Sequence, residues 1–388
     1  MENHSLFVDK TRYIERLERS GQRAVFFSRP HGFGKSRFAD TLSAYYDRNA
    51  ADRFDTAFAG TYIADRKTPL ANQFYILRFS FRTLSTDTEA AFHQLVLDSL
   101  RDFFRRYPHP RGTEILQKPY SSSASLIESF FAGLGRDYRD GLYVIIDEYD
   151  PWGNAVLSTV AGNPVRATPD TTFLTNFFLK IKTALGDFGP VERLFVCGNT
   201  LISPFSLTDG YFPAIDLSSD PQYAGLFGLT EPELRRLICQ QLPSTVHSGT
   251  NRLLQELKSR CGGYRFSPYI EETVFNAAQC LAFLKDVSTG HSALQETLIT
   301  LFRLSDPGDV RDIVKCVQNR NPIDFGADAL WLPNLSDLPH LDRDRLLTAL
   351  YGLGCVTTVP GDDFALTVPN NAAATELQKA FESVNLQR

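Results

Sequence analysis

Short apolar runs alternate with helix-length segments in the first part of the chain. The run at 142–146 is continuously hydrophobic, which is typical of a strand that is buried on both faces of a parallel sheet. We predict strands at 23–27, 74–81, 142–147, 193–197 and 214–217. We predict helices at 37–46, 88–106, 123–138 and 171–185, and a surface loop at 158–170. This alternation predicts an α/β fold, in which helices cover a sheet.

After Asp220 the strand signals fade and helical patterns dominate. We predict helices at 231–241, 251–260, 271–286, 293–304 and 343–352. The last of them leads into two β-rich runs, 355–359 and 364–368, which a Gly-containing turn joins into a hairpin. Helices followed by a hairpin are similar to a winged-helix unit. The polar stretch 218–229 suits a hinge, so we expect one domain at 1–225 and a second at 226–388.

The first predicted strand leads into a loop with a chemical signature. Its sequence is Ser28-Arg29-Pro30-His31-Gly32-Phe33-Gly34-Lys35-Ser36. A strand, a Gly-containing turn and a helix start place backbone N–H groups and the positive end of the helix dipole around a phosphate. Lys35 would neutralise the β- and γ-phosphates, and Ser36 would hold Mg²⁺. Because Arg29 replaces the first glycine of the general G-x-x-x-x-G-K-[ST] motif, an ordinary surface turn stays open as an alternative for this loop alone.

A second element strengthens the phosphate-loop interpretation. The buried strand at 142–147 ends in Asp147 and is followed by Glu148. Parallel sheets bind ligands at the carboxyl ends of their strands. There, Asp147 can reach a magnesium ion, and Glu148 can polarise a water for attack on a γ-phosphate. A core strand that ends in a solvated acidic turn is the alternative.

Composition sets limits on partners and location. The chain has 388 residues, of which 43% are hydrophobic and 22% charged, and its net charge is −5. This mild charge gives no global attraction to nucleic acid or membranes. No apolar run approaches the roughly 20 residues that span a bilayer. The six cysteines are scattered without a C-x-x-C pair, which indicates reduced thiols and an intracellular location, in the cytoplasm or nucleus.

Six sequence pieces, in order along almost the whole chain, resemble the AAA-ATPase-like family, which is often fused to a PD-(D/E)xK-type nuclease domain. They are Phe7-Val8-Asp9-Lys10-Thr11, the loop from Ser28 to Ser36, Ile146-Asp147-Glu148-Tyr149-Asp150, Asp216-Leu217-Ser218 with Leu226-Phe227-Gly228-Leu229-Thr230, Gly263-Tyr264-Arg265-Phe266-Ser267 and Leu366-Thr367-Val368-Pro369-Asn370. The resemblance implies a P-loop NTPase of the additional-strand, AAA-like type. Its sheet order would be 5-1-4-3-2, followed by a helical and winged-helix-like region.

The resemblance also implies a set of ATP-binding residues beyond Lys35 and Ser36. Within and after the loop, which corresponds to the Walker A motif, these are Arg29, Pro30, His31, Gly32, Phe33, Gly34 and Arg37. Asp147 and Glu148 correspond to the Walker B motif. Asp9 and Lys10 match the N-terminal motif and would line the base or ribose, with a solvated helix start as the alternative.

Two further polar residues have candidate roles at the phosphates. Asn199 follows the fourth predicted strand, where P-loop ATPases of this type keep a γ-phosphate sensor, and Thr200 is the second choice. An ordinary loop after a buried strand is the alternative for both. Arg265 could reach the phosphates from the second domain, or it could belong to a structural turn beside Gly262 and Gly263.

The chain departs from the family pattern in two places. The family usually carries Arg where His31 and Gly32 stand, so the loop loses positive charge and nucleotide affinity could be lower. Few residues follow Pro369-Asn370, and they hold no nuclease constellation. We therefore expect that the protein lacks the nuclease or that the chain is a truncated form.

These observations predict a Mg²⁺-dependent ATPase that moves its C-terminal region. One alternative is a nucleotide switch or scaffold with little turnover, similar to STAND signalling NTPases, that acts through a protein partner or a homo-oligomer. A second is a DNA-acting component of a mobile-element or defence system. Arginines at 101, 105, 106 and 111 interleave with aromatic residues and could bind DNA. At helical spacing, however, we expect the aromatics to face the core and the arginines to face water.

Overall fold

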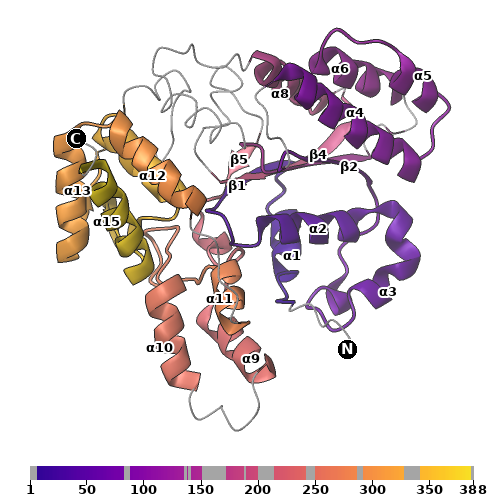
Figure 1. Cartoon of the computed structure of the whole chain (residues 1–388). Coiled ribbons are helices and arrows are strands. Elements are labelled where there is room, and N and C mark those ends of the chain that lie inside the picture. Colours follow the sequence, from indigo (N-terminus) through magenta and orange to yellow (C-terminus); the bar gives the residue numbers. More distant parts are fainter. Residues whose placement is uncertain are drawn as a thin grey trace.

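The computed structural model describes residues 7–82, 88–134, 138, 141–150, 172–187, 189–199, 214–241, 250–285, 292–326 and 341–385. Within these ranges a central sheet carries helices on both sides, and further helices and a small sheet follow toward the C-terminus (Figure 1). The predicted loop at 158–170 and Thr200 lie outside the described residues.

The central sheet confirms the predicted strands and their order. Its strands are β1 (Ala24–Ser28), β2 (Tyr75–Ser80), β3 (Leu142–Asp147), β4 (Val191–Gly198) and β5 (Ile215–Asp216). They are parallel and follow the order β2-β3-β4-β1-β5, which is 5-1-4-3-2 counted from the other edge. In the register, Ser28 faces Gly198 and Asp147 faces Cys197, so the carboxyl ends of β1, β3 and β4 share one edge of the sheet.

Both faces of the sheet are buried, as the unbroken apolar run of β3 predicts. Val144 and Ile146 face one hydrophobic cluster, whereas Tyr143 and Ile145 face another. The first face carries α4 (Glu89–Arg106), α5 (Gly112–Gln117), α6 (Ser123–Leu134) and α8 (Thr172–Ala184), and the second carries α1 (Arg12–Arg19), α2 (Lys35–Tyr46) and α3 (Phe54–Ala57), with the 3₁₀ turns η1 (Arg48–Arg53) and η2 (Ala64–Arg66) (Figure 1). Because neither face of these strands is polar, helices must cover the sheet on both sides.

The C-terminal part is mainly helical and contains a three-stranded antiparallel sheet of order β6-β8-β7. Its elements are η4 (Pro221–Tyr223), α9 (Glu231–Gln241), α10 (Thr250–Cys261), α11 (Ala277–Leu284), α12 (Ser292–Leu304), α13 (Pro307–Asn319), β6 (Ile323–Asp324), α14 (Arg343–Gly352), β7 (Thr357–Val359), β8 (Asp362–Thr367) and α15 (Asn371–Asn385). The predicted hairpin is confirmed as β7 and β8. The winged-helix likeness stays a prediction.

One predicted helix begins later than expected. The predicted helix at 271–286 is wrong at its start, because α11 begins only at Ala277. Before it, Val274 exchanges backbone hydrogen bonds of 2.8 and 3.2 Å with Tyr264. Asn276 then caps the helix by accepting a hydrogen bond from the backbone N–H of Gln279. Phe275 likewise exchanges backbone hydrogen bonds with Leu229, so pairing with other segments overrides the local helical preference over these residues.

The predicted hinge at 218–229 is packed against the first part of the chain. Leu226 and Phe227 are buried, and the Phe227 ring lies edge-on to Phe27 of β1 at a centroid distance of 5.4 Å. The domain division at residue 225 thus stays a prediction. No helix within the described ranges is long and apolar enough to cross a membrane.

Candidate functional site

The loop between β1 and α2, residues 28–36, lies at the carboxyl edge of the central sheet, and we call it the phosphate loop. β1 ends at Ser28 and α2 begins at Lys35. Gly32 and Gly34 both have a φ of 90°, a conformation that glycine adopts without the steric cost of a side chain. The two glycines therefore let the backbone turn sharply and present N–H groups ahead of the helix.

Lys35 is buried beneath the loop, with 5% of its surface exposed. Its Nζ donates hydrogen bonds to the carbonyls of Arg29 (2.7 Å) and Pro30 (3.0 Å) and to Oδ1 of Asn199 (2.8 Å). Burial lowers the pKa of Lys35, while nearby acidic groups, including Asp150 and Glu148, raise it. The structure thus brings Lys35 together with the predicted sensor Asn199.

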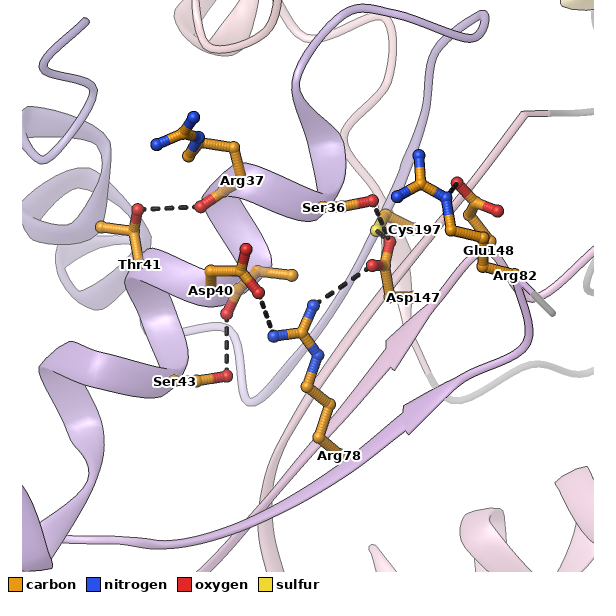
Figure 2. A network of polar contacts seen from close by, with 11 residues as sticks. Ser36, Arg37, Asp40, Thr41, Ser43, Arg78, Arg82, Asp147, Glu148 and Cys197 are labelled. Carbon is orange, nitrogen blue, oxygen red and sulfur yellow. Dashed lines mark hydrogen bonds and ion pairs between the residues drawn. The ribbon is translucent and has the colours of Figure 1, made fainter. Parts of the chain in front are cut away.

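The acidic end of β3 faces the start of α2, as Figure 2 shows. The Ser36 hydroxyl donates to Oδ1 of Asp147 at 3.1 Å, and the Cys197 thiol donates to the same oxygen at 3.3 Å. The other carboxylate oxygen, Oδ2, accepts from Arg78 of β2 at 3.2 Å, and Arg78 also pairs with Asp40 of α2. Asp147 is thereby held by contacts from three neighbouring elements.

Glu148 lies next to Asp147 and carries an unusual backbone. Its φ is 53°, in the left-handed region that non-glycine residues seldom adopt. Its Oε1 pairs with Nε of Arg82 at 3.4 Å (Figure 2). Arg82 is largely exposed, whereas the Glu148 side chain is mostly buried. The backbone turn directs Glu148 into the same cavity as Arg82 and Lys35.

Asp150 completes the acidic groups near Lys35. It is buried, and its Oδ2 accepts from the backbone N–H of Asn199 at 2.8 Å. Burial raises the pKa of Asp150 to about 6, although Lys35 opposes the shift. Asp150 therefore links the segments that follow β3 and β4, close to the ammonium group of Lys35.

The phosphate loop forms one wall of a cavity of about 280 Å³. Lys35, Ser36, Arg82 and Glu148 line its polar end. The rest of the wall is largely apolar and includes Phe7, Val8, Leu226, Leu229, Leu237, Ala277, Ala278 and Leu281. A mostly apolar cavity with a few convergent polar groups is typical of a small-molecule site, and its charged end at a helix start suits an anion.

The other predicted loop residues take different places. His31, Gly32, Phe33, Gly34 and Arg37 line the cavity. Burial lowers the pKa of His31, and the charge of Lys35 adds to this effect. Pro30 is buried. Arg29 is also buried, with its guanidinium 4.2 Å from the centre of the Phe266 ring, and burial lowers its pKa to about 10.

The remaining predicted residues are only partly brought together. Lys10 lines the cavity and pairs with Glu233 at 2.7 Å. Asp9 lies outside it and accepts hydrogen bonds from the backbone N–H groups of Thr11 and Tyr62. The structure does not bring Arg265 into the cavity: its guanidinium donates to the carbonyls of Thr358 (3.1 Å) and Glu271 (3.0 Å), as expected for the structural-turn alternative.

Sequence reasoning gave no role to Arg78, Arg82 or Asp150. A usable signal existed, because an arginine within a mostly apolar strand such as β2 needs a charged partner. Strand register then decides which partner Arg78 meets. Ser80 lies opposite Asp147 across the β2–β3 pair, and Arg78 is two residues before Ser80 on the same face of the sheet, so its side chain reaches Asp147 diagonally. The apolar wall was also missed, because it is assembled from segments far apart in the sequence.

The side chains of the site also indicate which metal ion it could bind. Among the described residues there is no cluster of three or more His, Cys, Asp or Glu side chains that could hold a metal by itself. The Ser36 hydroxyl and the Asp147 carboxylate are hard oxygen donors of the kind that Mg²⁺ takes in combination with phosphates. This pair fits a magnesium ion that arrives with a nucleotide.

Comparisons with known proteins give a family. A family model described as a predicted AAA-ATPase matches residues 1–209. The chain is also 25% identical over 278 residues to an uncharacterised protein from the vnfD 5′ region of Azotobacter chroococcum mcd 1. That alignment covers 70% of this chain and 46% of the relative, so the chain spans about half of the relative's length.

Two solved structures are similar over nearly the whole chain. Cdc6p from Pyrobaculum aerophilum is 14% identical, with a TM-score of 0.28 over 96% of this chain and 93% of its own. The ORC2 protein from Aeropyrum pernix, solved as ADPNP–ADP complexes, is 12% identical, with a TM-score of 0.35 over 97% of this chain and 92% of its own.

Proposed function

The chain belongs to the AAA-ATPase-like family, and from this premise we propose that it binds Mg²⁺-ATP at the phosphate loop and hydrolyses it. The observation that carries the proposal is the convergence of Lys35, Ser36, Asp147 and Glu148. Ser36 and Asp147 are in direct contact, and Lys35 and Glu148 line the same cavity. Nucleotide phosphates would lie at this charged end and the base along the apolar wall.

The residues have distinct roles in the proposed reaction. Lys35 neutralises the β- and γ-phosphates. To do so, its ammonium group gives up its hydrogen bonds to the loop carbonyls of Arg29 and Pro30 and donates to phosphate oxygens instead. Glu148 polarises the attacking water, and Asn199, already bonded to Lys35, senses the γ-phosphate. Ser36 and Asp147 would hold Mg²⁺, which supplies charge neutralisation at the phosphates when it is bound.

We further propose that hydrolysis moves residues 226–388, a helical lid with a winged-helix-like end, relative to residues 1–225. Support comes from the cavity itself, because its walls combine the phosphate loop with Leu237 of α9 and Leu281 of α11. A ligand that contacts both parts shifts their relative position toward the arrangement that it binds best.

Nucleotide binding and turnover with ATP and GTP test this proposal. Calorimetry should show binding to the wild type and none to Lys35→Ala, because the buried ammonium is the main phosphate cation in the loop. Glu148→Gln should bind normally and lose turnover by about a hundredfold or more. Equal ATP affinity in the wild type and Lys35→Ala would defeat the assignment.

A nucleotide switch with little turnover is the second candidate. The ion pair between Arg82 and Glu148 favours it, because this contact occupies a carboxylate oxygen that would otherwise accept a hydrogen bond from the attacking water. Phosphate release under multiple-turnover conditions separates the two functions. A switch would release little beyond one equivalent per chain, whereas an ATPase would continue.

Surface charges give the DNA-acting alternative little support. Phe103, Phe104 and Tyr107 are buried, as expected, and the arginines at 101, 105, 106 and 111 each pair with a carboxylate. The β7–β8 hairpin also exposes Asp362 and Asp363. These charges disfavour contact with a phosphate backbone. Retention on DNA at low salt is the measurement that would revive this alternative.

A further inference from the structure

The C-terminal region, residues 226–388, binds three successive carbonyls of the phosphate loop. The side-chain Nδ2 of Asn276 donates to the carbonyl of His31 at 2.9 Å. The backbone N–H of Ala278 donates to Gly32 at 2.9 Å, and that of Gly228 donates to Phe33 at 2.8 Å. The loop is thus an interface between the two parts of the chain as well as a candidate phosphate site.

Side chains strengthen the same interface. The Phe33 ring lies edge-on to Tyr264 and Phe266, at centroid distances of 4.9 and 5.2 Å. The Arg29 guanidinium lies over the Phe266 ring at 4.2 Å. All of these side chains are buried, so the contacts exclude water from one side of the loop.

The geometry of the peptide bond connects these carbonyls to phosphate binding. A carbonyl and the N–H of the next residue share one rigid plane and point in opposite directions. The carbonyls of His31, Gly32 and Phe33 therefore fix the N–H groups of Gly32, Phe33 and Gly34, which are candidate donors to phosphate. Contacts that hold these three carbonyls in place therefore also fix the direction of the three N–H groups.

Of these three donors, only Asn276 uses a side-chain group, whereas the other two are backbone N–H groups. It is buried, with 5% of its surface exposed, and its Oδ1 caps α11 by accepting from the N–H of Gln279 at 3.2 Å. Its own backbone N–H donates to Cys261 of α10 at 2.7 Å. A Cβ at Gly32 would lie 2.5 Å from Asn276 Oδ1, so the two residues are in close contact. A rotation of the loop at Gly32 must therefore displace Asn276 and α11.

We propose that Asn276 is a positioning residue that couples nucleotide occupancy of the phosphate loop to the C-terminal region. This inference rests on the proposed nucleotide binding and adds the route of communication. The route runs through the backbone of the loop rather than through Arg265, whose guanidinium bonds to Thr358 and Glu271 outside the cavity. Because coupling between two sites is reciprocal, weakening the contact should affect both the loop and α11.

Asn276→Asp is the discriminating variant. Aspartate keeps the oxygen that caps α11, but it cannot donate to the His31 carbonyl and places a negative charge against it. Asn276→Ser is a second variant that also keeps a cap oxygen and introduces no charge. Loss of the helix cap therefore cannot explain an effect that both variants share.

Asn370 provides a matched control elsewhere in the C-terminal region. It is also buried, its Oδ1 accepts from Ala373 at the start of α15, and its Nδ2 donates to the Gly262 carbonyl at 2.9 Å. Asn370→Asp makes the same chemical change at a helix start, but the hydrogen-bond partners of Asn370 among the described residues lie outside the phosphate loop.

Two measurements on the full chain test the coupling: affinity for a non-hydrolysable ATP analogue with Mg²⁺, and hydrogen exchange of residues 275–285. In the wild type the analogue should slow exchange in this segment by about tenfold. Asn276→Asp and Asn276→Ser should bind about tenfold more weakly and, at saturating analogue, should lose that slowing. Asn370→Asp should match the wild type in both measurements.

The outcomes separate this inference from the proposed function. If the wild type does not bind the analogue, the proposed function and the inference both fail. If the wild type binds but exchange at 275–285 does not change, the inference alone is overturned. Normal affinity and full slowing of exchange in Asn276→Asp would also overturn it, as would equal losses in Asn276→Asp and Asn370→Asp.

Discussion

The hydroxyl of Ser36 donates a hydrogen bond of 3.1 Å to a carboxylate oxygen of Asp147, although 111 positions separate the two residues in the chain. The contact joins the first turn of α2 to the end of β3, on the edge where β1, β3 and β4 end together. Hydroxyl and carboxylate oxygens at such an edge are suitable ligands for a magnesium ion that accompanies a phosphate group.

This contact predicts a metal-specific defect. Ser36→Ala should weaken ATP binding by about tenfold in Mg²⁺ and leave it unchanged in EDTA, because only the metal contact is lost. Ser43→Ala is the matched control, since its hydroxyl lies in the same helix and bonds only to the Ala39 carbonyl among the described contacts. A fluorescent ATP analogue measures both affinities. Equal weakening in Mg²⁺ and in EDTA would argue against a metal role.

The two arginines that pair with the acidic residues should differ in their effect on stability. Arg78→Met should lower the free energy of unfolding by about 1–2 kcal/mol, because it leaves the buried Asp147 with one fewer charged partner. Arg82→Met is the matched control and should change it by less than about 0.5 kcal/mol, because Arg82 is largely exposed. Urea denaturation measures both, and equal losses would contradict the difference in burial.

Asp150 predicts a pH dependence of stability. Burial raises its pKa from 3.8 to about 6, so between these values the folded chain holds a proton that the unfolded chain releases. Stability therefore falls as pH rises through this window, and the penalty is complete above about pH 6. Asp150→Asn removes the penalty. The free energy of unfolding of this variant, minus that of the wild type, should be larger at pH 7 than at pH 5 by about 1 kcal/mol.

This prediction is checked by denaturant titrations of both proteins at pH 5 and pH 7. Other carboxyl groups titrate in both proteins, so the difference isolates Asp150. A difference that is the same at both pH values would show that the folded protein does not raise this pKa.

Arg29 should contribute little to stability despite its burial. Only its Nη1 donates a hydrogen bond, to the Ser28 carbonyl at 2.7 Å, while Nε and Nη2 have no hydrogen-bond partner within the part of the chain that the structure describes. Arg29→Met should therefore be at least as stable as the wild type, because it removes a desolvated charge and keeps the volume. Arg29→Ala should cost about 3 kcal/mol, because it leaves a cavity beside Phe266. Thermal or urea unfolding tests the pair, and a large loss in Arg29→Met would refute this account.

The loop and the strand ends of the site could be predicted from the sequence. The apolar run that ends at Asp147 and the glycines before Lys35 are local signals, and both lie where we expected them. The strand order came from the family resemblance, and the pairing confirms it. The start of α11 was wrong because Val274 and Phe275 pair with Tyr264 and Leu229, and the residues at 271–276 do not by themselves indicate those partners.

The sequence by itself therefore determined the parallel sheet, the phosphate loop and the two acidic residues, because continuous apolar runs and glycine turns act over a few neighbouring residues. Only the tertiary structure decided that Arg78 faces Asp147, that Arg82 faces Glu148 and that Asn276 holds the His31 carbonyl. Arg78 lies in β2, Arg82 lies just after it and Asn276 lies in the C-terminal region, so these contacts depend on strand register and on how the packed parts fit together. Strand register and packing depend on which side chains become buried over the whole chain, and a short stretch of sequence does not contain that information.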